Sequence, residues 1–305
     1  MKNISKLKQF IISPAGIAIA LVWTVYVVLT FLIPQTATSR EKFAIAKTTL
    51  VFIQLTVALP YLILWFCTGY GSWLFRRVTD PARLTFSKYF SWALGFLLCG
   101  MMLQTVVSTA RSLLVADQSW WPALTILLNL SYTFFPVIGY WLMLRGLQAT
   151  RAAADTGKLF SKSHFLQAIA GALVVAMPFI WFVFTNANRL IPFAPDTPAT
   201  YYLSDPLIII LIVIPSVLSW IVGLLVAFKA SDSLEFTERK ENADFFNGIF
   251  LVVLSSIILQ ALISIGTERL FNLGLGVILL LIYLFILMQL VGYISLAQNA
   301  RKLLD

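Results

Sequence analysis

Eight long stretches of this chain contain no charged residue, and this pattern constrains the fold more than any other feature. Each stretch holds at least 22 residues; together they cover 9–39, 48–75, 89–110, 118–144, 165–188, 206–228, 245–267 and 270–300. A transmembrane helix needs about 20 apolar residues. The composition agrees, because 60% of the 305 residues are hydrophobic and only 11% are charged, against about 25% charged in soluble domains. The sequence therefore predicts an all-α integral membrane protein with eight transmembrane helices.

The first charge-free stretch follows a basic start and has to be distinguished from a secretory signal. Its apolar run from Ile12 to Leu32 is longer than the core of about 7 to 15 residues found in a signal peptide. We expect a retained first span that begins with Ser13 as the helix cap and Pro14 in the first turn.

The distribution of lysine and arginine over the connections predicts the orientation, because cytoplasmic loops carry the excess. One side of the predicted topology holds 16 of the 22 basic residues, in the amino terminus, 76–88, 145–162, 229–240 and the carboxyl tail. The other side holds only six. We therefore expect both termini on the cytoplasmic side of a cell membrane. This membrane is expected to be a plasma membrane or a bacterial inner membrane.

The net charge of +9 belongs mainly to that predicted cytoplasmic face. Such a face is expected to contact anionic lipids. No stretch interleaves basic and aromatic residues densely enough to favour nucleic-acid binding. The segment 229–244 alternates in charge sign, which is typical of a solvated helix and makes it the best candidate surface for a soluble protein partner.

Matching residues about 155 positions apart suggest an internal repeat. Residues 88–108 align without a gap over 244–264, which places Gln104 over Gln260. Pro60 and Trp65 likewise match Pro215 and Trp220, and IGY at 138–140 matches VGY at 291–293. The order of these features is the same in both halves, which predicts two four-helix repeats, 1–150 and 151–305. An even number of spans makes them parallel, related by an axis along the membrane normal; the alternative is convergence of two apolar sequences.

Several amides fall inside the predicted spans, where an unpaired polar group would cost several kcal/mol. Interhelical hydrogen bonding is the simpler role for them, and lining of a polar path is the alternative. The candidates are Gln104, Gln260, Gln54, Asn129 and Gln289.

Four prolines interrupt predicted spans, and each removes a backbone hydrogen bond from its helix. They are packing features or hinges: Pro60, Pro136, Pro178 and Pro215.

The spans lack the usual groups of catalysis and ion coupling. No Asp or Glu lies within them, so the buried carboxylate of ion-coupled pumps is missing. The one histidine, His164, falls at the start of a span, and Cys67 and Cys99 show no metal-ligand spacing. We expect free thiols, an interfacial histidine, and no catalytic, cofactor or metal site.

Three functions remain open. The first is a facilitative transporter or channel component, with its path between the two repeats. The second is a non-transporting subunit, scaffold or sensor that acts through cytoplasmic partners. The third is an intramembrane lipid-modifying enzyme, which the lack of acids and bases in the spans disfavours.

Overall fold

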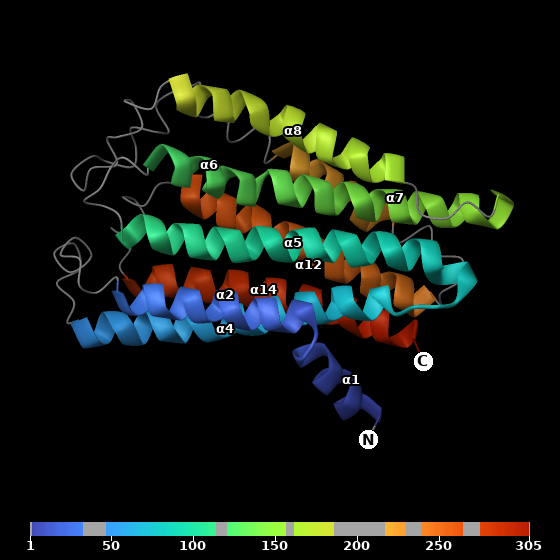
Figure 1. Ribbon diagram of the computed structural model, residues 1–305, viewed down its shortest axis with the longest axis horizontal. Coiled ribbons are helices and arrows are strands. Elements are labelled where there is room, and N and C mark those ends of the chain that lie inside the picture. The colour runs from blue at the N-terminus through green and yellow to red at the C-terminus, as the bar shows by residue number, and fades with distance from the viewer. Residues whose placement is uncertain are drawn as a thin grey trace.

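The computed structural model is a bundle of helices that run along one common axis (Figure 1). It describes residues 2–32, 47–113, 121–156, 162–185, 217–229, 239–264 and 275–304. Within these ranges the chain forms helices and short turns and no strand. The all-helical part of the sequence prediction is therefore confirmed for the described chain.

The labelled helices are α1 Lys2–Ile11, α2 Pro14–Leu32, α4 Lys47–Arg76, α5 Pro81–Leu113, α6 Trp121–Tyr132, α7 Phe134–Thr156, α8 Lys162–Thr185, α12 Arg239–Ser264 and α14 Leu275–Lys302. From α2 onward the helices run up and down through the bundle, with α7 continuing in the direction of α6 (Figure 1). A shorter apolar helix without a label covers Val217–Lys229.

Two of the described helices are long and apolar enough to cross a membrane. These segments are Arg83–Val107 in α5 and Leu280–Lys302 in α14. Ser5–Ile11 and Pro14–Leu29 would make a third span if the two helices, bent by 58°, are counted together. The described helices thus include two or three candidate membrane spans, and the total of eight spans stays a prediction.

The predicted start of the first apolar helix is confirmed. Helix α2 begins at Pro14, and the Ser13 hydroxyl accepts a hydrogen bond from the backbone N–H of Gly16 at 3.3 Å. This contact satisfies one of the N–H groups that the first helical turn leaves without a backbone partner.

The prolines occupy different places in their helices. Pro60 and Pro178 lie inside α4 and α8, which continue through them. Pro136 is instead the third residue of α7, directly after the break at Thr133 that separates α6 from α7. Without an N–H, proline costs no hydrogen bond in a first turn, whereas inside a helix it removes one. Pro215 lies outside the described residues.

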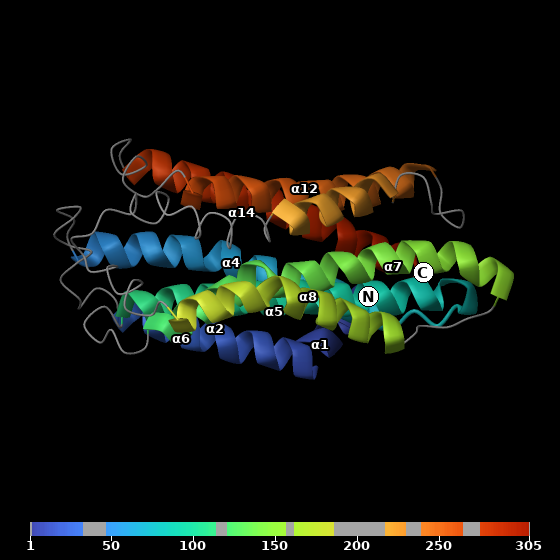
Figure 2. The same cartoon turned by 90° about the horizontal axis from the view of Figure 1, so that it is seen from above.

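Helices α12 and α14 form a layer of their own against the rest of the bundle (Figure 2). Aromatic rings join this layer to the others near one end. Phe245 of α12 lies 5.6 Å from Phe86 and 5.8 Å from Phe90 of α5, and 6.4 Å from Phe75 of α4, between ring centroids. All four rings are buried, so this cluster packs α4, α5 and α12 together.

Glycines allow close approach between neighbouring helices. A Cβ on Gly292 of α14 would lie 2.7 Å from the carbonyl oxygen of Gly248 on α12. A Cβ on Gly139 of α7 would lie 2.8 Å from the Leu97 side chain on α5. Small residues at these crossings bring backbones together, as is common in membrane helix packing.

Candidate functional site

A buried polar cluster connects α7, α12 and α14 inside the bundle. The Gln289 amide nitrogen donates to the Ser256 hydroxyl at 3.4 Å, and the Tyr140 side chain also hydrogen-bonds Ser256. Tyr140 is 2% exposed and Gln289 is 5% exposed. The cluster thus joins a helix from the first half of the chain to two helices from the second half.

Local sequence positions each member of this cluster. Tyr140 lies one turn beyond Pro136 in α7, and Gly223 of the helix Val217–Lys229 gives room to its ring, since a Cβ there would lie 3.4 Å away. On α14, Gln289 and Tyr293 are four residues apart and therefore share a face. Tyr293 is as buried as Tyr140.

The hydrogen-bonding capacity of the cluster is not fully used. The Ser256 hydroxyl donates to the Val252 carbonyl at 2.9 Å, so it accepts from its other neighbours. The Gln289 carbonyl oxygen Oε1 is buried and has no hydrogen-bond partner. Because a buried acceptor without a donor is costly, the arrangement favours a polar group with an N–H or O–H at this place. The side chains of Gln289, Ser256 and Tyr140 carry no charge.

The structure places one of the five predicted amides in this cluster. Gln289 belongs to the cluster, whereas Gln104 lies half-buried on α5. Gln54, Asn129 and Gln260 lie on α4, α6 and α12, and their side chains lie outside the described part of the structure. The pairing of Gln104 with Gln260 stays a prediction.

Sequence reasoning did not select Tyr140 for the site. The signal was present, because Tyr140 and Tyr293 are the matching tyrosines of IGY at 138–140 and VGY at 291–293. Tyrosine is common in membrane proteins for other reasons, above all in the belts at the membrane surface. Only burial of both rings in the bundle separates them from belt residues.

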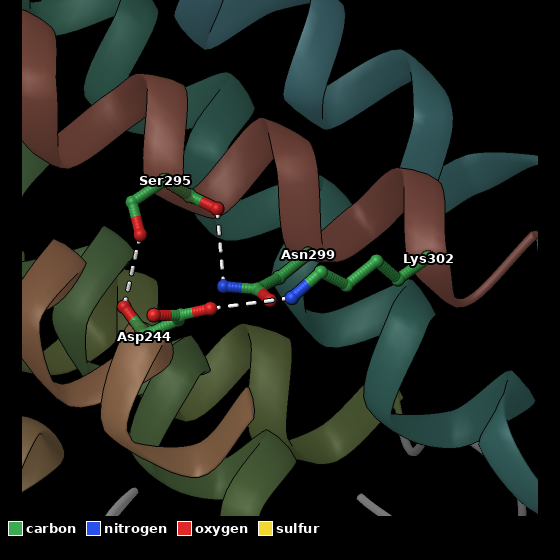
Figure 3. A network of polar contacts seen from close by, with 4 residues as sticks. All are labelled: Asp244, Ser295, Asn299 and Lys302. Carbon is green, nitrogen blue, oxygen red and sulfur yellow. Dashed lines mark hydrogen bonds and ion pairs between the residues drawn. The ribbon is translucent and has the colours of Figure 1, made fainter. Parts of the chain in front are cut away.

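A second polar group holds the ends of α12 and α14 together near the carboxyl terminus (Figure 3). The Asp244 carboxylate pairs with the Lys302 ammonium at 3.2 Å, and the Ser295 hydroxyl donates to the Asp244 carbonyl at 3.0 Å. Asn299 is buried and donates to the Ser295 carbonyl at 3.1 Å. All four residues lie on the two helices, and the two contacts of Asp244 cross from α12 to α14, so this group fixes their relative position.

The lone histidine makes a contact between helices. His164, in the first turn of α8, lies with its Nδ1 2.6 Å from the Tyr89 hydroxyl of α5. Burial and, second, the positive charge of Arg145 lower the pKa of His164. Both causes disfavour the imidazolium. In the neutral ring the tautomer decides whether Nδ1 accepts the tyrosine O–H or donates to its oxygen.

The remaining predicted features are partly described. Cys67 and Cys99 are free thiols, as expected. Of the candidate partner segment 229–244, residues 230–238 lie outside the described chain. Over the described residues no group of three His, Cys, Asp or Glu side chains could hold a metal ion.

Comparison of the chain with protein-family models, with curated proteins and with solved structures finds no match.

Proposed function

We propose that this protein is a facilitative transporter or channel component of a cell membrane, which passes a small uncharged polar solute between its two halves. The observation that carries the proposal is the buried contact of Gln289 with Ser256 and Tyr140, which leaves the Gln289 carbonyl oxygen without a donor. A solute with an N–H or O–H group would satisfy this oxygen while it occupies the cluster.

The proposal includes the eight-span topology with both termini in the cytoplasm. In support, α2, α4, α5 and the pair α6–α7 alternate in direction, and both chain ends lie toward the same end of the bundle (Figure 1). Helices α4 and α7, which precede connections predicted to be cytoplasmic, also end toward this end of the bundle.

The proposed repeat receives support from equivalent helix contacts. In the first half, α5 packs against α7 at Gly139, and in the second half α12 packs against α14 at the matching Gly292. Across the halves, α4 meets α14 at Gly71, which would place a Cβ 3.5 Å from Ala297, and the helix Val217–Lys229 meets α7 at Gly223. A twofold axis along the membrane normal would produce such paired contacts.

Liposome flux tests the proposal. Purified protein is reconstituted, and the entry of glycerol, urea, acetamide and a charged control, glutamate, is followed by light scattering after rapid mixing. We expect passage of at least one neutral solute and none of glutamate. Lack of passage of every neutral solute overturns the proposal and favours a subunit or scaffold with cytoplasmic partners.

Two substitutions on α14 test which glutamine lines the proposed solute path. Gln289→Leu removes the buried amide, and Gln298→Leu, nine residues further along α14, changes an exposed glutamine. We expect flux to fall in the first variant and to stay at the native level in the second, with the same thermal stability in both. Gln104→Leu and Gln260→Leu test the remaining predicted pair in the same assay.

A further inference from the structure

The first helix does not continue the direction of the second. Helix α1 ends at Ile11, and the chain bends by 58° before α2 begins at Pro14. Figure 1 shows α1 leaving the common axis of the bundle near the end where both termini lie. Because Ser13 and Pro14 form a proper helix start, the bend is built into the sequence.

One aromatic side chain attaches α1 to the bundle. Phe10 is fully buried, with its ring centroid 5.0 Å from Phe66, 5.4 Å from Tyr70 and 5.8 Å from Trp73 of α4, all edge-on. Gly69 lies beneath this contact, where a Cβ would come within 3.3 Å of the Phe10 ring. The bent arrangement therefore has its own packing and does not arise from a free end.

A polar contact supports the same attachment. The Arg77 guanidinium lies 3.9 Å above the Trp73 ring and donates to the Gln9 side-chain oxygen at 2.7 Å. This contact places an exposed arginine at the end of α4 beside the lysines of α1.

The side of α1 that the bundle leaves uncovered is apolar at its centre and basic at its edges. Leu7 and Ile11, one turn apart, are 38% and 50% exposed, and Ile12 is 74% exposed. Residues 2–11 contain three lysines and no acidic residue. A helix that combines an apolar face with basic flanks is typical of segments that lie in the plane of a membrane surface.

We propose that α1 lies along the cytoplasmic membrane surface, with Leu7, Ile11 and Ile12 among the lipid chains and its lysines at the phosphates of anionic phospholipids. Charge complementarity identifies the lipid, because α1 contains three lysines and no acidic residue, Arg77 contacts it through Gln9, and the cytoplasmic leaflet carries negative charge. The bend at Ile12 and Ser13 turns α1 from the direction of the span into the plane of the surface. This inference requires membrane insertion of the bundle and does not depend on transport.

Spin labels at two positions on different sides of α1 test the inference in the full chain. Cys67 and Cys99 are replaced by alanine, and a nitroxide is attached through Ile11→Cys or, as the matched control, Ser5→Cys. These positions are six residues apart, which separates them by about 120° around the helix. The protein is placed in lipid nanodiscs of phosphatidylglycerol or of phosphatidylcholine, and collisions with oxygen and with a water-soluble nickel chelate are measured.

We expect the label at position 11 to favour oxygen several-fold over the label at position 5 in phosphatidylglycerol. The contrast should be smaller in phosphatidylcholine, and also when Lys2, Lys6 and Lys8 are all changed to Gln. Equal nickel accessibility at the two positions overturns the in-plane position. An equal contrast in both lipids overturns the role of anionic lipid, and a label immobilised by protein in both lipids shows a protein partner instead. The flux assay measures none of these quantities, so the proposed transport and the proposed position of α1 can be refuted separately.

Discussion

The contact between α12 and α14 allows a quantitative prediction. In Gly292→Ala the new methyl carbon would lie 2.7 Å from the Gly248 carbonyl oxygen and 2.8 Å from the Val252 side chain. Backbone cannot rotate away as a side chain can, so the two helices must separate by several tenths of an ångström. Overpacking of this kind costs about 1–3 kcal/mol, and we expect the upper half of that range here.

The substitution also stabilises the helix itself, and this gain must be subtracted from the cost of overpacking. Alanine stabilises a helix interior by about 1 kcal/mol relative to glycine. The expected net loss for Gly292→Ala is therefore about 1–2 kcal/mol. Gly171 on α8 provides the matched control, because a Cβ there meets nothing within 4 Å. Gly171→Ala should retain the helix gain, so the two variants should differ by about 2–3 kcal/mol.

Unfolding in detergent micelles by a graded addition of dodecyl sulfate, followed by circular dichroism, measures this difference. The double variant Gly248→Ala/Gly292→Ala gives a second test. Once the helices have moved apart for one methyl group, the second should cost less than it does alone, since neighbouring sites are not additive. If Gly292→Ala is as stable as Gly171→Ala, the close approach of α12 and α14 is wrong.

The remaining predictions concern the transport site, the first helix and two contacts near the ends of the helices. Gln289→Leu should reduce solute flux while Gln298→Leu leaves it unchanged, and a label on Ile11 should lie deeper in anionic lipid than one on Ser5, each measured as described above. Because the pKa of His164 is lowered on folding, the unfolded chain binds a proton more readily than the folded chain. The free energy of unfolding should therefore decrease as the pH falls below about 6.5. Unfolding measured at a series of pH values should show this decrease in the native protein and not in His164→Gln. The Asp244–Lys302 pair is exposed by 38% and 44%, so Lys302→Met should lower the free energy of unfolding by less than about 1 kcal/mol; a loss that persists in high salt would contradict a screened surface pair.

The sequence predicted the class of fold from particular local signals. Long charge-free runs favour apolar helices, and the Ser13–Pro14 pair indicates a helix start that the structure confirms. The same reasoning did not foresee that α1 is a separate helix with its own packing against α4. Its first three lysines showed a basic end, but the burial of Phe10 depends on Phe66 and Tyr70, more than fifty residues away in the chain.

The prolines show the same division between local and distant information. A proline inside an apolar run predicts a disturbed helix, and at Pro136 the disturbance is a break at Thr133 that makes it a first-turn residue. At Pro60 and Pro178 the helix continues. Inside α4 and α8 the pyrrolidine ring removes one hydrogen bond, whereas in the first turn of α7 it removes none; the packing around each helix decides whether it breaks.

By itself, the sequence determined that the described chain is helical and that some of its helices are apolar enough for a membrane, because charge and hydropathy are properties of each segment alone. Tertiary structure decided which polar residues meet. Gln289 was one of five candidate amides, and the sequence favoured Gln104 and Gln260 over it. Its contact with Ser256 and Tyr140 depends on how α7, α12 and α14 pack. The physical reason is that a buried amide acquires its role from the partners within about 3 Å, and those partners come from helices far apart in the chain.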